Sequence, residues 1–166
     1  MDKIFQKLVN NNFSELAGLR VDSSIPVPEH LVNEIIEAAL QGNKNINYCR
    51  VSISGQNLVS VNLKTPLWPW PLNFKLRLFR SVDFARSPKI RASLESNVLL
   101  GKLGSLFNAL PAGINVYDGQ VAVDIQSFLS TPEQKRMLDL VKSVEVRTEQ
   151  ARVILDVRIK VEDNGG

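Results

Sequence analysis

The sequence predicts an α+β fold in which a strongly twisted, mainly antiparallel sheet is wrapped around a long apolar helix, with additional packed helices. The segment 98–111 is the most apolar long stretch, and in it apolar residues recur at helical spacing. Most of the chain on either side alternates apolar and polar residues with a period of two, as strands do. Short turn sequences join these runs, and the resulting hairpins make a sheet antiparallel.

Length and composition bound the kind of protein. At 166 residues the chain predicts a single domain over 1–166, and 44% apolar with 22% charged residues is typical of a soluble globular protein. The net charge of +3 permits attraction to anionic surfaces without requiring it. The start of the chain lacks a signal-like apolar region, so we expect a cytoplasmic or peripherally membrane-associated protein, or a periplasmic one if a signal peptide has been removed.

The first part of the chain predicts two helices. Apolar residues at mostly three- and four-residue intervals predict an N-terminal amphipathic helix over 1–19, which either packs on the core or meets a membrane or a partner. A short extended piece, 19–25, leads to two prolines. Pro28 suits the first turn of a second helix, Glu29 favours its positive end, and Gly42 ends it.

The remaining strands and one more helix follow from alternation and turn chemistry. Alternating runs predict strands over 46–53, 59–63, 73–78 and 90–95, with 82–84 either continuing the third strand or forming a short one. Asp118 and Gly119 predict a tight hairpin within 114–125. Thr131, Pro132 and Gln134 predict a capped helix that lasts to about Ser143. A short run at 144–146 precedes the last long strand, 153–161, and 162–166 is expected to be a disordered tail.

No motif for catalysis, metal binding or a cofactor stands out. Cys49 is the only cysteine, which excludes an internal disulfide and a cysteine metal cluster, and we expect it to be a small buried strand residue. His30 is the only histidine, and the chain has no Gly-x-Ser-x-Gly elbow. Gly101 and Gly104 lie inside the apolar segment, not at a phosphate-binding loop. We therefore expect a protein that is not an enzyme and has no cofactor.

Cations occupy the polar positions of several predicted strands. A sheet that gathers these strands would carry a basic outer face, which is either simply solvated or contacts anionic lipid headgroups or nucleic acid. Nucleic acid is not expected, because Tyr48, Phe74 and Phe84 fall on the inward positions and do not alternate with the cations. The predicted basic face consists of Lys75, Arg77, Arg91, Arg152, Arg158 and Lys160.

The segment 65–72 is the best candidate for a surface site. It contains Trp68 and Trp70 among three prolines, which remove backbone donors and fix backbone angles, so the segment is predicted to be a stiff extended loop. Tryptophan rings favour the boundary between membrane and water. The alternative is that both rings close one end of the core.

Two runs resemble a known family. The run 110–124 (LPAGINVYDGQVAVD) and the run 25–36 (IPVPEHLVNEII) are similar to bacterial members of the tubular lipid-binding superfamily, among them small lipid-binding domains. The resemblance covers about residues 19–161. It implies an apolar groove between a twisted sheet and a helix, which holds acyl chains without catalysing a reaction.

The sequence therefore supports two hypotheses of different kinds. The first is binding of lipid or another long apolar ligand in such a groove, with contact to an anionic membrane surface, and with Trp68 and Trp70 at the membrane or the groove mouth. The second is a protein-interaction or scaffold domain with a filled core and an unidentified partner. The predicted groove-lining residues are Leu99, Leu103, Leu106, Phe107, Phe74, Leu76 and Leu78.

Overall fold

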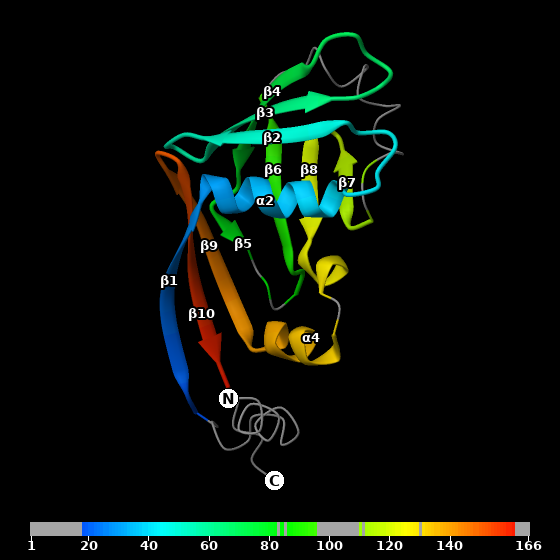
Figure 1. The fold of residues 1–166 in the computed structure, drawn as a ribbon. Helices are drawn as coiled ribbons and strands as arrows, with labels where there is room; N and C mark the ends of the chain where they lie inside the picture. Colours follow the sequence, from blue (N-terminus) through cyan, green and yellow to red (C-terminus); the bar gives the residue numbers. More distant parts are fainter. Residues whose placement is uncertain are drawn as a thin grey trace.

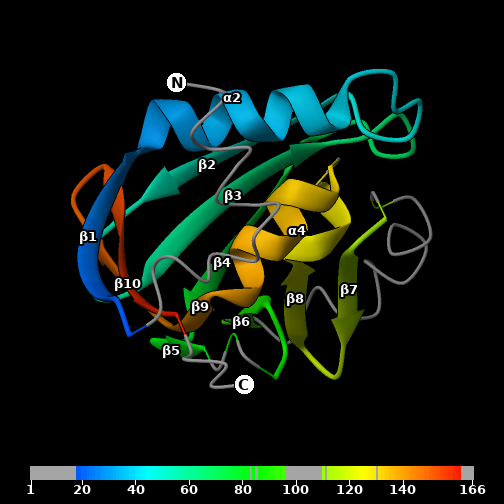
Figure 2. The same ribbon diagram turned by 90° about the horizontal axis from the view of Figure 1, so that it is seen from below.

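The computed structural model describes residues 18–82, 84, 86–95, 110, 112–129 and 131–161. These residues form mainly antiparallel strands arranged in two sheets (Figure 1). One sheet has six strands in the order β2-β3-β4-β6-β8-β7, and the other has four in the order β1-β10-β9-β5. Seen from below, β1 and β10 lie at one side of the molecule, β7 and β8 at the other, and α2 runs along β2 (Figure 2).

The six-stranded sheet is built from three hairpin-like pairs. Two of its turns use left-handed backbone: Gln56 and Asn57 have φ of 62° and 58°, and Asp118 and Gly119 have φ of 47° and 73°. Such turns match the twist of the flanking strands, which confirms both predicted hairpins. The strands are β2 (Tyr48–Ile53), β3 (Leu58–Lys64), β4 (Leu72–Leu78), β6 (Lys89–Leu94), β7 (Ile114–Tyr117) and β8 (Gln120–Asp124).

The four-stranded sheet differs from the prediction in the lengths of its strands. It contains β1 (Arg20–Pro28), β5 (Ser81–Val82), β9 (Val141–Glu149) and β10 (Arg152–Lys160). The extended piece continues through Pro26 and Pro28, because β1 is an edge strand and a proline there costs no ladder hydrogen bond. β9 begins at Val141, two residues before the predicted helix end, and pairs with β10 along most of its length.

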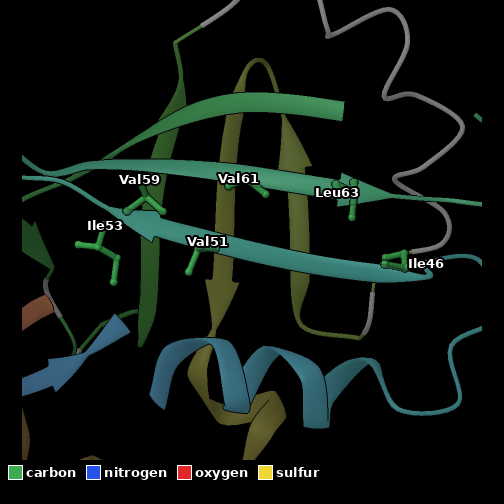
Figure 3. Packing of buried hydrophobic residues seen from close by; sticks show 6 residues of the cluster. All are labelled: Ile46, Val51, Ile53, Val59, Val61 and Leu63. Atoms are coloured by element: carbon green, nitrogen blue, oxygen red, sulfur yellow. The ribbon is translucent and has the colours of Figure 1, made fainter. Parts of the chain in front are cut away.

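Two helices flank the sheets. In α2 (Glu29–Leu40), which confirms the second predicted helix, Val32, Ile36 and Leu40 pack against the main core cluster. Figure 3 shows that cluster above α2, with Ile46 just before β2, Val51 and Ile53 on β2, and Val59, Val61 and Leu63 on β3. The helix α4 (Pro132–Asp139) begins with the predicted capping box between Thr131 and Gln134. A 3-10 turn, η3 (Ile125–Phe128), precedes α4.

Asn57 joins the two sheets at the β2–β3 turn. Its side-chain amide donates to the carbonyl oxygens of Leu78 on β4 (3.3 Å) and Val146 on β9 (3.0 Å). Its Oδ1 accepts from the backbone N–H of Thr148 at 2.9 Å. A second core cluster, Phe84, Val144 and Val146, packs beside this joint. One polar side chain therefore ties the β2–β3 turn to β9 of the other sheet.

The predicted fold class is wrong in its central feature. The described residues contain two short helices, α2 and α4, and no long apolar helix wrapped by a sheet. The apolar inner faces of the strands are covered by α2 and by each other, as the members of the two core clusters show. The segment that suggested the long helix, 98–111, lies outside the described residues except for Leu110, which packs against the main cluster. The predicted N-terminal helix and the tail 162–166 also lie outside them, apart from residues 18 and 19.

Neither of the helices in the described residues is long and apolar enough to cross a membrane. Those residues also contain no group of three or more His, Cys, Asp or Glu side chains that could hold a metal ion.

Candidate functional site

The predicted basic residues do not lie on one face. Lys75, Arg77 and Arg91 lie on β4 and β6, on the outer face of the six-stranded sheet. The other three, Arg152, Arg158 and Lys160, lie on β10 in the four-stranded sheet. Alternation assigns a residue to a face of its own strand but does not say which strands share a sheet, so the prediction merged two separate surfaces.

The outer face of the six-stranded sheet carries more cations than the prediction included. The strand register places Arg50 on β2, Lys64 on β3 and Lys89 on β6 on the same face as Lys75, Arg77 and Arg91. We call these six residues the basic face. The signal for the added residues was present in the sequence, because each has the polar parity of its strand.

Few carboxylates neutralise the basic face. Glu95 pairs with Arg77 (Nε to Oε1, 2.7 Å), and the hydrogen bond from Arg77 lowers the pKa of Glu95. Asp124 lies opposite Lys89 in the strand register. Within the described residues, Arg50, Lys75 and Arg91 are exposed and form no ion pair. The basic face is therefore a surface of net positive charge.

On the four-stranded sheet, in contrast, several cations form ion pairs with carboxylates. Arg147 bonds both Asp156 (2.8 Å) and Glu149 (2.9 Å), and Glu149 also pairs with Arg152. Arg158 pairs with Asp22 at 3.1 Å. These hydrogen bonds lower the pKa of Glu149, chiefly through Arg152, and that of Asp156, chiefly through Arg147. Most of the cations on this sheet already have partners.

The proline-rich loop, 65–71, lies at one end of the basic face. Trp70 is 74% exposed and Leu67 is 66% exposed, whereas Trp68 is half-buried, so the two tryptophans predicted at the mouth differ. Lys64 holds the loop, because its Nζ donates to the carbonyl oxygens of Trp68 (3.3 Å) and Pro69. Tyr48, which was predicted to face inward, is 45% exposed and lies opposite Lys64 in the register, on the same face as Arg50, so that prediction was wrong. An apolar, aromatic tip thus adjoins the cations.

The groove-lining residues divide into two groups. Phe74, Leu76 and Leu78 lie on the inner face of β4, where they are half-buried and pack against the main core cluster. They are therefore core residues in the described part of the chain. Leu99, Leu103, Leu106 and Phe107 lie outside the described residues. An apolar groove between a sheet and a helix stays a prediction.

A groove beside α2 was not predicted. It is a groove of about 980 Å³ between α2 and β2, lined by polar side chains such as Asn33, Glu34 and Glu37. Next to it, Asn33 bonds the backbone N–H (2.8 Å) and carbonyl (2.9 Å) of Val51, and Glu29 accepts from the N–H of Ile53 (2.7 Å). These bonds cover the edge of β2, so the helix protects a strand edge that could otherwise pair with another chain.

Cys49 lines the same groove but is not prepared for reaction. It is half-buried on β2, as expected from the sequence, and burial raises the pKa of its thiol to about 11. The nucleophilic form of cysteine is the thiolate, and the raised pKa disfavours that form at neutral pH.

Comparisons with protein-family models, curated proteins and solved structures found no significant match. The resemblance to the tubular lipid-binding superfamily therefore stays a prediction.

Proposed function

We propose that this protein binds lipid at an anionic membrane surface, without catalysing a reaction, and that the loop 65–71 and the basic face make the contact. The observation that carries the proposal is the position of Leu67 and Trp70, which are exposed on a stiff loop at the end of the basic face, where Arg50, Lys75 and Arg91 form no ion pair with any described residue. The two features supply the two signals that reversible membrane binding needs, apolar insertion and electrostatic attraction.

The expected contributions are of similar size. Transfer of Leu67 and Trp70 from water into the interface is worth about 2 kcal/mol each. Each cation close to an anionic surface adds about 1 kcal/mol. The bond from Lys64 to the loop and the proline residues limit the freedom that the loop loses on insertion. The combination predicts binding that needs both anionic lipid and the exposed side chains.

Co-sedimentation of the full chain with vesicles tests this. One set of vesicles contains phosphatidylglycerol and phosphatidylcholine in equal amounts, and the other contains phosphatidylcholine alone. We expect binding to the anionic set, weakened by salt, and a loss of about 1,000-fold in the Leu67→Ser/Trp70→Ser variant, since two side chains at about 2 kcal/mol each are removed. Tyr117→Ser is the matched control, because Tyr117 is 85% exposed but lies on β7, at the other edge of the sheet.

If the wild-type protein binds neither vesicle set, the proposal is overturned and the protein-interaction hypothesis is favoured. Equal binding by the loop variant and the wild type would also contradict it. Thermal unfolding of each variant shows whether the fold is intact, and none of these exposed residues is expected to change the melting temperature much.

A further inference from the structure

A shallow hollow of about 500 Å³ opens on the basic face, between β2, β3 and β4. The strand register arranges its outward side chains in two rows of three, one from each strand. Ser60 lies on the central strand β3, Ser52 lies beside it on the edge strand β2, and the other four side chains are longer. The rows are Arg50, Asn62 and Asn73, and Ser52, Ser60 and Lys75.

The two cations stand at opposite corners of this arrangement. Arg50 is on β2 and Lys75 on β4, two strands away and offset by two residues, so their Cα atoms are about 12 Å apart. Side chains of this length can both reach a group in the centre. Neither forms an ion pair within the described part of the chain.

The remaining side chains supply hydrogen-bond donors. Asn62 donates to Oδ1 of Asn73, so Nδ2 of Asn73 keeps its two hydrogens for another acceptor. The hydroxyls of Ser52 and Ser60 can donate as well. None of the six side chains is a carboxylate. The carboxylate of Glu29 also lines the hollow, but its Oε2 already accepts from the backbone N–H of Ile53.

We propose that this hollow binds the phosphate of a phosphomonoester lipid headgroup, as in phosphatidic acid. An arginine fork, an ammonium group and neutral amide donors around one centre suit an anion with several free oxygens. A monoester phosphate presents three such oxygens and is not shielded by a further headgroup. The inference rests on the proposed function and adds to it the class of lipid that the protein selects.

The test compares vesicles that carry the same surface charge in two forms. One set contains phosphatidic acid in phosphatidylcholine, and the other contains oleic acid, a carboxylate, in phosphatidylcholine. We expect the wild type to bind the phosphatidic acid set about tenfold more tightly, and Arg50→Gln/Lys75→Gln to lose that preference. The matched control is Lys89→Gln/Arg91→Gln, which removes the same charge from the far end of the same face and should keep the preference.

Each result decides a different question. Equal binding of the two charged sets by the wild type would overturn the phosphate site and leave the proposed function standing, whereas binding to neither would overturn both. Loss of the preference in the control variant would show that only total charge matters, which also overturns the site. A titration with inorganic phosphate, followed by NMR of the Asn62 and Asn73 side-chain amides, distinguishes a lipid phosphate from a free phosphate. If free phosphate saturates the site and the protein shows no preference among vesicles, the ligand is a soluble phosphate and the lipid proposal is overturned.

Discussion

The two sheets differ in how they treat their outward cations. On the four-stranded sheet Arg147, Arg152 and Arg158 each bond a carboxylate of the same surface. On the six-stranded sheet Arg50, Lys75 and Arg91 have no such partner in the described residues. Surface ion pairs contribute little to stability, so the pairs are not required for folding. In the described residues, the six-stranded sheet therefore leaves more of its outward charge unpaired than the four-stranded sheet does.

Mutation of Asn57, which joins the two sheets, is expected to have the largest effect on stability, because its side chain bonds residues of both sheets. Asn57→Ala removes the three hydrogen bonds to Leu78, Val146 and Thr148 and puts alanine at a φ of 58°. We expect a loss of about 3 kcal/mol in the free energy of unfolding, measured by urea denaturation. Asn57→Gly loses the same bonds without the backbone strain and should lose less. Equal stability of Asn57→Ala and wild type would show that the sheets do not depend on this residue.

Matched charge removal on each sheet tests the comparison itself. Arg50→Gln/Lys75→Gln/Arg91→Gln should weaken binding to phosphatidylglycerol vesicles by about 100-fold, since each cation contributes about 1 kcal/mol. The triple variant Arg152→Gln/Arg158→Gln/Lys160→Gln changes net charge equally, but two of its cations are already paired. We expect it to bind almost as well as the wild type. Equal losses in both triple variants would mean that total charge, not its placement, governs binding.

Among the described residues, two buried threonine hydroxyls have no hydrogen-bond partner, and they offer a smaller test. They belong to Thr65, at the base of the proline-rich loop, and Thr148, on β9. Replacement of either residue by valine removes the cost of the unpaired hydroxyl and should stabilise the protein by about 1 kcal/mol. A higher melting temperature of Thr65→Val with unchanged vesicle binding would show that the loop acts through its exposed tip. A lower melting temperature of Thr65→Val would show that this hydroxyl has a hydrogen-bond partner.

Lowering the pH should destabilise the four-stranded sheet slightly more than the six-stranded sheet. The pKa values of Glu149 and Asp156 are lowered by Arg152 and Arg147 in the folded protein. A lowered pKa means that the folded state binds fewer protons than the unfolded one, so stability is present at neutral pH and falls as the pH drops through the carboxyl range. Amide exchange protection, corrected for intrinsic rates, should fall more on β9 and β10 than on β3. An equal loss of amide exchange protection on β3, β9 and β10 would contradict the expected role of these ion pairs.

Local patterns in the sequence predicted most of the elements but not their assembly. The turn at Asp118 and Gly119 and the cap at Thr131 depend on neighbouring residues, and both were predicted correctly. The division into two sheets depends on pairings such as that of β1 with β10, far apart in the chain, which alternation does not encode. The predicted fold class was wrong because α2 and the other strands cover the inner faces of the described strands, and periodicity does not show which element covers a face.

The candidate site was predicted in part for the same reason. The exposure of Trp70 was one of two interpretations, and the other one suits the half-buried Trp68 better. The basic face was predicted from parity alone, so three of its members were missed and three residues of the other sheet were included. The roles of Asn33 and Glu29 along the edge of β2 had no sequence signal, because they depend on how α2 lies against that strand.

The most direct measurement of the central claim follows the fluorescence of Trp70 alone, in the Trp68→Phe variant of the full chain. Addition of vesicles that contain phosphatidylglycerol and brominated phosphatidylcholine should shift the emission to the blue and quench it, and high salt should reverse both changes. Phosphatidylcholine vesicles without anionic lipid should have little effect. Emission that stays unchanged with anionic vesicles would show that Trp70 does not enter a membrane interface and would contradict the proposed mode of binding.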